Sequence, residues 1–246
     1  CRLDPKLLWP VRHRDQKAHA DLAVIKSREM LVKSRTQLIN HARGAVKTNG
    51  KRLPSCSAAS FTKRCQSQVP GDLLQALEPI FKTISQLSEQ IRELDHKINQ
   101  LCEQQYPQTK HLRQVPGVGP VTALTYVLSL EDPARFIKSR QVGAYLGLTP
   151  RRDQSGKSDK QLRISKAGNK YLRQLLVSCS HYINGPFGPD SDLRRHGMSI
   201  AARGGKNAKK RAVVAVARKL AVLLHRLWVT GEPYQLFYRS KVKMVA

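Results

Sequence analysis

A regular apolar repeat in the middle of the chain constrains its fold more than any other feature. Large aliphatic residues recur there at alternating spacings of three and four. These residues are Leu77, Ile80, Ile84, Leu87, Ile91, Leu94, Ile98 and Leu101. Such a repeat is a heptad seam, whose narrow apolar stripe needs a partner helix. We therefore predict a helical, coiled-coil stalk over residues 72–106, paired either with another helix of this chain or with a second copy.

The segments on both sides of the stalk are also predicted to be mainly α-helical. Apolar residues at helical spacing run over 16–49 and again over 207–228. The cations on the first of these helices either form a solvated face or lie along a nucleic-acid backbone. Gly and Pro at residues 184–206 predict a loop or lid. The expected organisation is a helical segment at 1–50, a linker at 51–71, the stalk at 72–106, a C-terminal domain at 107–232 and a loosely held tail at 233–246.

The charge of the chain limits the kinds of partner that it can have. It carries 44 Lys and Arg against 17 Asp and Glu, a formal net charge of +27. Because neutralised phosphates release counterions, DNA or RNA is the expected partner. Anionic lipid is the alternative, but no apolar run approaches the roughly 20 residues of a membrane span. The five scattered cysteines include no C-x-x-C pair, which favours free thiols in a reducing cytoplasm over zinc ligands or disulfides.

A glycine-rich turn opens the C-terminal domain. Gly117 and Gly119 lie in an apolar stretch ahead of a predicted helix at 121–130. Glycine lets the backbone turn tightly and approach a phosphate, and the free N–H groups of the next helix face it. The pattern is typical of a helix-hairpin-helix DNA-binding element, and an ordinary helix–helix turn is the alternative.

A serine in a loop crowded with cations follows this turn. Residues 141–150 predict a short helix, and apolar clusters within 148–164 predict a short β-hairpin with Ser155 and Gly156 at or near its tip. We expect the surrounding cations to contact DNA. They are Arg151, Arg152, Lys157, Lys160, Arg163, Lys166, Lys170 and Arg173, with a second basic patch at Lys209, Lys210 and Arg211. Such a density of cations around a hydroxyl indicates a phosphate-handling site.

The chemistry open to Ser155 depends on what surrounds it. A Ser before Gly in a polar loop is commonly a turn residue. A nucleophilic serine needs stabilisation of transition-state charge and a base. The nearby cations supply charge, but no His is adjacent, so the base has to come from elsewhere or from a metal-bound hydroxide. Two-metal phosphoryl transfer needs several convergent acids, and the acids here are dispersed. We therefore expect no metal site or cofactor in this chain.

Several motifs together resemble the C-terminal transposase domain of the insertion-sequence 110 family. They are PGVGP at 116–120, AYLGLTP at 144–150, QSG at 154–156, ISKAGN at 164–169 and LR at 172–173. Upstream stretches at 3–8, 12–14, 20–23 and 35–40 resemble the region that follows the family's nuclease domain. The resemblance therefore covers nearly the whole chain.

This resemblance implies a DNA transposase or recombinase of the bacterial cytoplasm, associated with the nucleoid when bound to DNA. Family members join a RuvC-like domain, with four metal-binding acids, to this C-terminal domain, and a structured guide RNA selects donor and target DNA. Ser155 stands where the family's serine nucleophile stands, which attacks the scissile phosphate and holds a covalent phosphoserine link. The stalk matches the family's dimerising stalk, which implies a homodimer or higher oligomer.

The family's four acids lie upstream of the region that matches Cys1. We therefore expect Mg²⁺ only together with that nuclease domain, and no DNA cleavage by this chain unaided. Two other interpretations stay open. The first is a non-catalytic DNA- or RNA-binding module, including a decayed transposase remnant. The second is a basic coiled-coil RNA-binding or ribosome-associated protein, which explains the charge and the heptads but not the Gln-Ser-Gly context.

Overall fold

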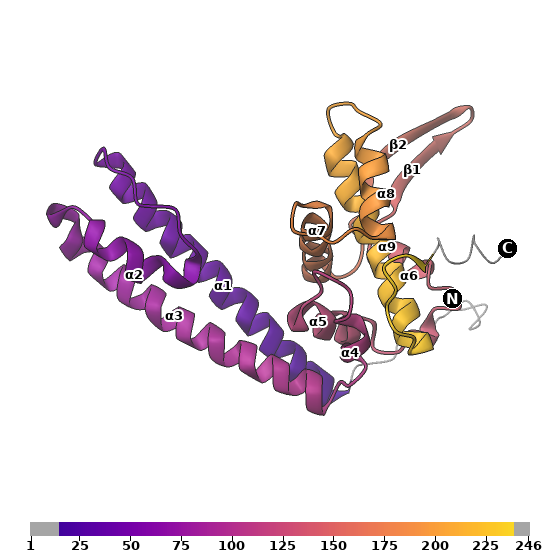
Figure 1. Cartoon of the computed structure of the whole chain (residues 1–246), viewed down its shortest axis with the longest axis horizontal. Helices are drawn as coiled ribbons and strands as arrows, with labels where there is room; N and C mark the ends of the chain where they lie inside the picture. The colour runs from indigo at the N-terminus through magenta and orange to yellow at the C-terminus, as the bar shows by residue number, and fades with distance from the viewer. Residues whose placement is uncertain (1–14, 239–246) are drawn as a thin grey trace, which may run out of the picture. The chain divides into compact units, whose positions relative to one another are not determined.

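The computed structural model describes residues 15–238, and of residues 158–161 it describes the backbone only. The chain is mainly helical, with one small two-stranded sheet within the described residues (Figure 1). It divides into two compact units, one up to Asn99 and one from Gln100. Between residues 15 and 238, no helix combines the length and the apolar character that a membrane span requires.

Two long helices form the first unit. Helix α1 (Gln16–Thr48) and helix α3 (Gly71–Gln104) run antiparallel (Figure 1). Arg28 is ion-paired with Asp95, and the Arg35 guanidinium donates to the Ser88 hydroxyl at 3.2 Å. The heptad seam on α3 therefore has an intramolecular partner, one of the two possibilities that the sequence left open.

The two halves of the heptad seam are buried to different degrees. Each heptad contributes two apolar residues to the seam. The first residue of each pair is buried, and the second is only partly covered, except in the last pair, where both are buried. The buried residues are Leu77, Ile84, Ile91, Ile98 and Leu101, and the partly covered residues are Ile80, Leu87 and Leu94. A half-covered apolar stripe therefore remains on α3.

The segment expected to be a linker is packed into the first unit. It contains η2 (Ala58–Ser60), α2 (Phe61–Cys65) and η3 (Gln66–Gln68). The ring of Phe61 stacks on that of Phe81 with centroids 5.4 Å apart, which fixes α2 against α3. A short helix of this kind carries too few turns to show a periodic signal in the sequence.

Helix α9 (Ala208–Thr230) is central to the core of the second unit. It contacts α4 (Thr109–Leu112), α6 (Gln141–Tyr145), α7 (Lys170–Asn184) and α8 (Asp192–Ala201). Helix α5 (Pro120–Leu130) is buried from Thr122 to its end. The buried Tyr126 of α5 donates its hydroxyl to the Ala221 carbonyl at 2.6 Å, and burial raises the pKa of this phenol.

One expectation for the second unit was wrong. Residues 184–206 were expected to form a loop or lid, but they contain helix α8, whose buried residues are Leu193 and Gly197 only. This short apolar face is too sparse to reveal a helix by periodicity. The loosely held tail predicted at 233–246 stays a prediction, because the part of it after Tyr238 lies outside the described residues. Within the described part, the Tyr234 amide donates to the Gln114 side chain at 2.7 Å.

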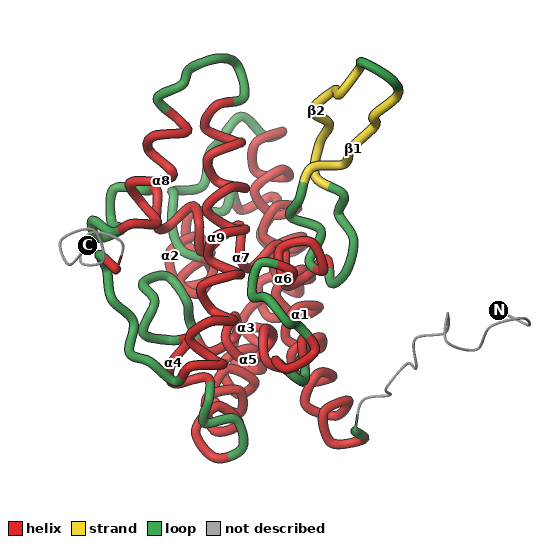
Figure 2. The backbone as a smooth tube through the Cα atoms, turned by 90° about the vertical axis from the view of Figure 1, so that its right-hand side faces the viewer, coloured by secondary structure: helices red, strands yellow, loops and turns green. Residues whose placement is uncertain are grey.

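The β-hairpin predicted around Ser155 is confirmed. Strand β1 (Pro150–Ser155) pairs antiparallel with β2 (Ser158–Ile164), and Ser155 pairs with Ser158 across a two-residue turn. Every residue of β1 is exposed. Figures 1 and 2 show the hairpin projecting away from the helices of its own unit. The hairpin is therefore an arm whose position depends on the residues at its base.

Candidate nucleic-acid interface and nucleophile

The base of the hairpin is fixed by contact between two backbone turns. The amide of Lys166 donates to the Gly147 carbonyl at 3.1 Å, and that of Ser165 donates to the Thr149 carbonyl at 2.9 Å. A Cβ on Gly147 would lie 2.2 Å from the Ala167 nitrogen, and φ of Gly147 is +65°. Only glycine allows both this conformation and this approach. The AYLGLTP and ISKAGN motifs therefore build one joint beneath the arm.

Asn169 joins this base to two helices. Its side-chain oxygen accepts hydrogen bonds from the Tyr171 and Leu172 amides at 2.9 and 3.1 Å, which caps α7. Its side-chain nitrogen donates to the Ser129 hydroxyl on α5 at 2.9 Å. Because one amide group meets both elements, it fixes where α7 begins relative to α5.

Arg173 differs from the other predicted DNA-binding residues because its guanidinium is engaged within the fold. One of its terminal nitrogens donates to the carbonyls of Leu146, Ala167 and Gly168. Partial burial lowers the pKa of Arg173 from its usual value. The Arg173 side chain thus provides a hydrogen-bond donor to three backbone carbonyls of the joint. Arg173 thus stabilises the joint under the hairpin.

Ser155 lies at the opposite end of the arm. It is the last residue of β1, it is exposed, and Gly156 after it turns the chain with φ of +56°. Alternation along the regularly paired part of the strand puts Ser155 and Asp153 on one face and Arg152 on the other, and a register irregularity lies between Pro150 and Arg152. The hydroxyl is therefore presented to solvent, with cations along the strand before it.

The predicted cations of the hairpin are exposed wherever the structure describes their side chains, Arg173 apart. The exposed residues are Arg151, Arg152, Lys157, Arg163, Lys166 and Lys170. For Lys160 only the backbone is described, and it pairs in register with Asp153. Exposed cations distributed along a projecting arm are free to neutralise phosphates.

The second basic patch lies at the turn between α8 and α9. Lys209, Lys210 and Arg211 are exposed in the first turn of α9. Gly204 and Gly205 before them both have positive φ, and Arg211 donates to the Gly204 carbonyl at 3.3 Å. Both views show this turn and the hairpin tip projecting from the same end of the second unit (Figures 1 and 2). The fold thus places two cationic patches, distant in sequence, at one end.

The glycine turn lies between α4, a single helical turn, and α5. Gly117 has φ of +88°, and a Cβ there would lie 2.8 Å from the ring of Tyr182 on α7. Gly119 is the N-cap residue of α5, and a Cβ added to it would meet no atom within 4 Å. The two glycines have different surroundings: Gly117 packs against protein and Gly119 borders open space.

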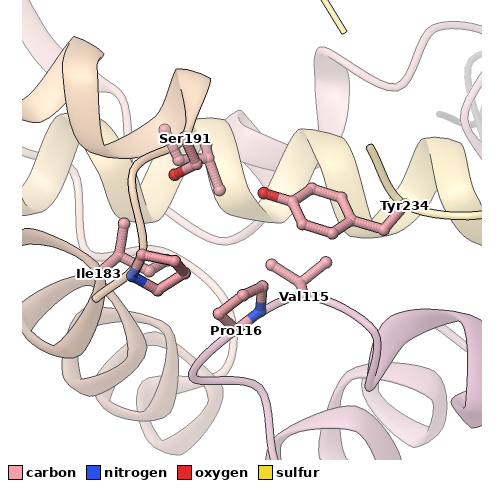
Figure 3. Close-up of a pocket in the computed structure, with 7 residues that line it drawn as sticks. Val115, Pro116, Ile183, Ser191 and Tyr234 are labelled. Carbon is pink, nitrogen blue, oxygen red and sulfur yellow. The ribbon is translucent and has the colours of Figure 1, made fainter. Parts of the chain in front are cut away.

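A small apolar recess lies behind this turn. Val115 and Pro116 line it together with Ile183, Ser191 and Tyr234 (Figure 3). The Tyr234 hydroxyl points toward Ser191, and burial raises the pKa of this phenol. The lining contains no cation, so the recess anchors the glycine turn and the C-terminal segment to one another and does not suit a phosphate.

Comparison with known proteins identifies the family that shares these features. Residues 109–185 match the model of the Transposase IS116/IS110/IS902 family. The chain is 32% identical over 225 residues to the transposase for insertion sequence element IS1111A of Coxiella burnetii, covering 87% of this chain and 59% of that protein. The chain belongs to the IS116/IS110/IS902 transposase family.

Further relatives extend this family assignment. The transposase for insertion sequence element IS1328 of Yersinia enterocolitica is 31% identical over 175 residues, which cover 69% of this chain and 51% of that protein. The pilin gene-inverting protein of Moraxella bovis is 29% identical over 152 residues, which cover 60% of this chain and 46% of that protein. The chain thus spans between about half and three fifths of the length of these relatives.

The acids of this family member do not converge on a metal site in the described part of the chain. Among residues 15–238, no group of three or more His, Cys, Asp or Glu side chains is placed to hold a metal ion. Asp132 caps the turn before η4 (Pro133–Arg135) by accepting from the Ala134 amide at 2.8 Å. The described residues therefore do not fit the two-metal chemistry of phosphoryl transfer.

Proposed function

We propose that this chain supplies the DNA-binding and strand-transfer part of a transposase, with Ser155 as the nucleophile. The observation that carries this proposal is the position of Ser155, an exposed hydroxyl at the tip of a cationic arm. The base of that arm is fixed by the contact between Gly147 and Ala167. A nucleophile presented in this way reaches a phosphate in a nucleic acid without rearrangement of the fold.

The proposed step is a phosphoryl exchange. The Ser155 oxygen attacks the phosphorus of a DNA phosphodiester, a new P–O bond to serine forms, and the bond to one DNA oxygen breaks. The serine proton passes to a base, and the released DNA oxygen takes up a proton. Attack by another DNA hydroxyl on the phosphoserine reverses these changes and restores a diester. Arg151, Arg152 and Lys157 offset the charge that develops on the phosphate.

The base for this step comes from outside the described residues around Ser155. Neither neighbour of Ser155 is a His or an acid, and Asp153 is two residues away, opposite Lys160 in the register. We propose that this base belongs to an acid-bearing domain of the kind that the family resemblance implies, and that Mg²⁺ would be held by that domain and not by this chain. A structured guide RNA is the proposed selector of donor and target DNA.

The same proposal includes a homodimer or higher oligomer formed through α3. The partly covered residues Ile80, Leu87 and Leu94 form a stripe that α1 leaves incompletely buried. A second copy would bury this stripe as a heptad seam requires. Replacing Leu87 and Leu94 together by Gln is expected to lower the mass measured by sedimentation to that of a monomer. An unchanged mass would contradict assembly through this stripe.

A second candidate function is a non-catalytic DNA- or RNA-binding module, including a decayed transposase. The exposed cations of the hairpin favour it, because phosphate binding needs no further chemical group. In this case the cationic arm and the α8–α9 turn bind phosphates, and Ser155 is a turn residue only. The two candidates predict the same binding and differ in covalent chemistry.

A trapping experiment separates the two candidates. The chain is mixed with the acid-bearing domain of a full-length family member, its guide RNA, Mg²⁺ and radiolabelled DNA, and the products are run on a denaturing gel. A labelled band that resists detergent is expected for the unmodified chain and for Ser178→Ala, which removes an exposed hydroxyl on α7. Ser155→Ala is expected to lose the band and keep DNA affinity. A band that persists in Ser155→Ala would exclude Ser155 as the nucleophile.

A further inference from the structure

The loop at residues 131–140, between α5 and α6, is held in place by a buried histidine. His225 of α9 is 1% exposed, and its two ring nitrogens lie 2.9 Å from the Ser139 hydroxyl and 3.0 Å from the Pro133 carbonyl. One imidazole thus ties together positions near the start and the end of the loop. A loop fixed at both ends loses little conformational entropy when it binds a partner.

The middle of this loop is fixed by aromatic packing. The ring of Phe136 meets the rings of Tyr145 and His225 edge to face, with centroids 5.3 and 5.5 Å apart. The Arg135 guanidinium lies 5.5 Å from the centroid of the Tyr145 ring. The backbone amide of Lys138 donates to the side-chain oxygen of Gln141 at 3.2 Å. The loop is therefore held in one well-defined shape. The side chain that follows Phe136 in the sequence is exposed to solvent.

That side chain is Ile137, which is 89% exposed, the highest value among the large hydrophobic residues of the described chain. Exposed cations lie on both sides of it: Arg135 two residues before, and Lys138 and Arg140 after. No acid occurs between residues 135 and 140. A single exposed apolar residue is ordinary on a protein surface. An exposed isoleucine on an anchored loop between cations has the chemistry of a wedge that enters stacked bases while its neighbours contact phosphates.

We propose that Ile137 is a DNA-distorting wedge: it inserts between adjacent base pairs of duplex DNA, with Arg135, Lys138 and Arg140 holding the phosphates beside it. This inference rests on the proposed function as a DNA-binding protein and adds a residue that deforms the duplex. Insertion of an aliphatic side chain unstacks one base step and kinks the DNA. In this proposal the kink changes the path of the DNA backbone beside the protein that carries Ser155.

Phe187 provides an internal comparison for Ile137. It is 83% exposed on another anchored turn, where Arg194 donates to the carbonyls of Ile183 and Gly188 at 3.1 and 2.9 Å. The residues next to Phe187 in the sequence are Gly and Pro, followed by Asp190, and the Arg194 guanidinium nearby is engaged by backbone carbonyls. It matches Ile137 in exposure and rigidity but lacks the phosphate-binding neighbours. Phe187→Ala is therefore the control for Ile137→Ala.

The test measures unwinding of a closed circular plasmid. A relaxed plasmid is incubated with the chain and a type I topoisomerase, protein is removed, and the topoisomers are separated. Bound protein is measured on the same plasmid at the same salt concentration by filter binding. An inserted side chain unwinds DNA at any sequence, so the unmodified chain and Phe187→Ala are expected to leave negative supercoils. Ile137→Ala is expected to reduce the change in linking number per bound molecule at least about twofold.

Each outcome decides the proposal. An equal change in linking number for Ile137→Ala at equal occupancy would overturn it, as would no change for the unmodified chain when bound. A lower sedimentation mass of Ile137→Ala with unchanged unwinding would instead place Ile137 in a contact between copies of the chain. Failure of every variant to bind the plasmid would reject DNA binding itself and the wedge with it. Because Ile137 is exposed, unchanged thermal unfolding is expected to confirm that the variant is folded.

Discussion

The base and the tip of the β-hairpin are both built around glycine and cationic residues, but the two ends use these residues differently. At the base, Gly147 meets the backbone of Ala167 and Arg173 donates to three carbonyls. At the tip, Gly156 has open space around it and Ser155 is exposed. The same residue types thus fix the arm at one end and are free to meet a ligand at the other.

Residues that position a site and residues that act in it therefore respond differently to substitution. A change at the base disturbs packing and moves the whole arm. A change at the tip leaves the fold intact and affects only what the arm binds or transforms. Matched substitutions at the two ends therefore test the distinction, because each pair changes the same residue type in a different setting.

The largest difference is expected between the two glycines. Gly147→Ala puts a Cβ 2.2 Å from the Ala167 nitrogen at a φ of +65°, so the two turns have to separate. We expect a loss in the free energy of unfolding of about 3 kcal/mol or more. Gly156→Ala meets no atom within 4 Å and carries only the conformational cost, about 1 kcal/mol. Thermal or urea unfolding of both variants measures this, and equal losses would contradict the account of the joint.

The next largest difference is expected between two arginines. Arg173→Ala removes the donors to three carbonyls, and we expect it to lower the free energy of unfolding by about 1–2 kcal/mol, since the side chain is partly exposed to solvent. Arg152→Ala, at an exposed strand position, is expected to change stability by less than about 0.5 kcal/mol.

DNA binding is expected to reverse the order of these two arginines. Arg152→Ala should weaken DNA binding and reduce the slope of log affinity against log salt by about 1. Arg173→Ala should keep the slope. Titrations of a DNA duplex at several salt concentrations provide the comparison. A reduced slope for Arg173→Ala alone would show that its guanidinium contacts phosphate.

A smaller effect is expected for the cap of α7. Asn169→Ala removes the acceptor for the Tyr171 and Leu172 amides and the donor to Ser129, with an expected loss of about 1 kcal/mol. Asn169→Asp keeps the cap acceptor and replaces the amide nitrogen, so it should recover most of this loss. Chemical unfolding of the two variants side by side checks this, and equal destabilisation would assign the effect to the contact with Ser129.

The smallest effect on stability is expected for Ser155→Ala. The residue is exposed at the tip, so its free energy of unfolding should match the unmodified chain within about 0.5 kcal/mol. Its affinity for DNA should also be unchanged, because the cations remain. Calorimetry and DNA titration test both statements, and a large loss of stability would place Ser155 in the structural part of the arm.

Much of this fold follows from local sequence patterns. The heptads predict α3 because a narrow apolar stripe at helical spacing is visible without knowledge of its partner. The hairpin is predicted by two short apolar clusters within 148–164. Ser155 and Gly156, which lie between these clusters, turn the chain. Helix α8 does not follow, because Leu193 and Gly197 are its only buried residues and glycine gives no apolar signal.

The candidate site follows from the sequence only in part. From the sequence alone, Arg173 and Arg152 are both predicted to contact DNA. Only the tertiary fold shows that Arg173 is engaged by backbone carbonyls and that Arg152 is exposed. The approach of Gly147 to Ala167 is a contact between backbones, so it leaves no pattern of side chains. Ile137 is an aliphatic residue that sequence rules assign to a core, and its exposure follows from the anchoring of its loop by His225.

The residue that attaches to DNA can be located directly by mass spectrometry. The covalent complex formed with the acid-bearing domain, guide RNA and Mg²⁺ is digested with trypsin and nuclease and analysed by mass spectrometry. The tryptic peptide 153–157 contains Ser155 as its only hydroxyl residue. We predict a nucleotide phosphate on this peptide, absent from Ser155→Ala. A nucleotide on another peptide, in the unmodified chain, would contradict the assignment of Ser155 as the nucleophile.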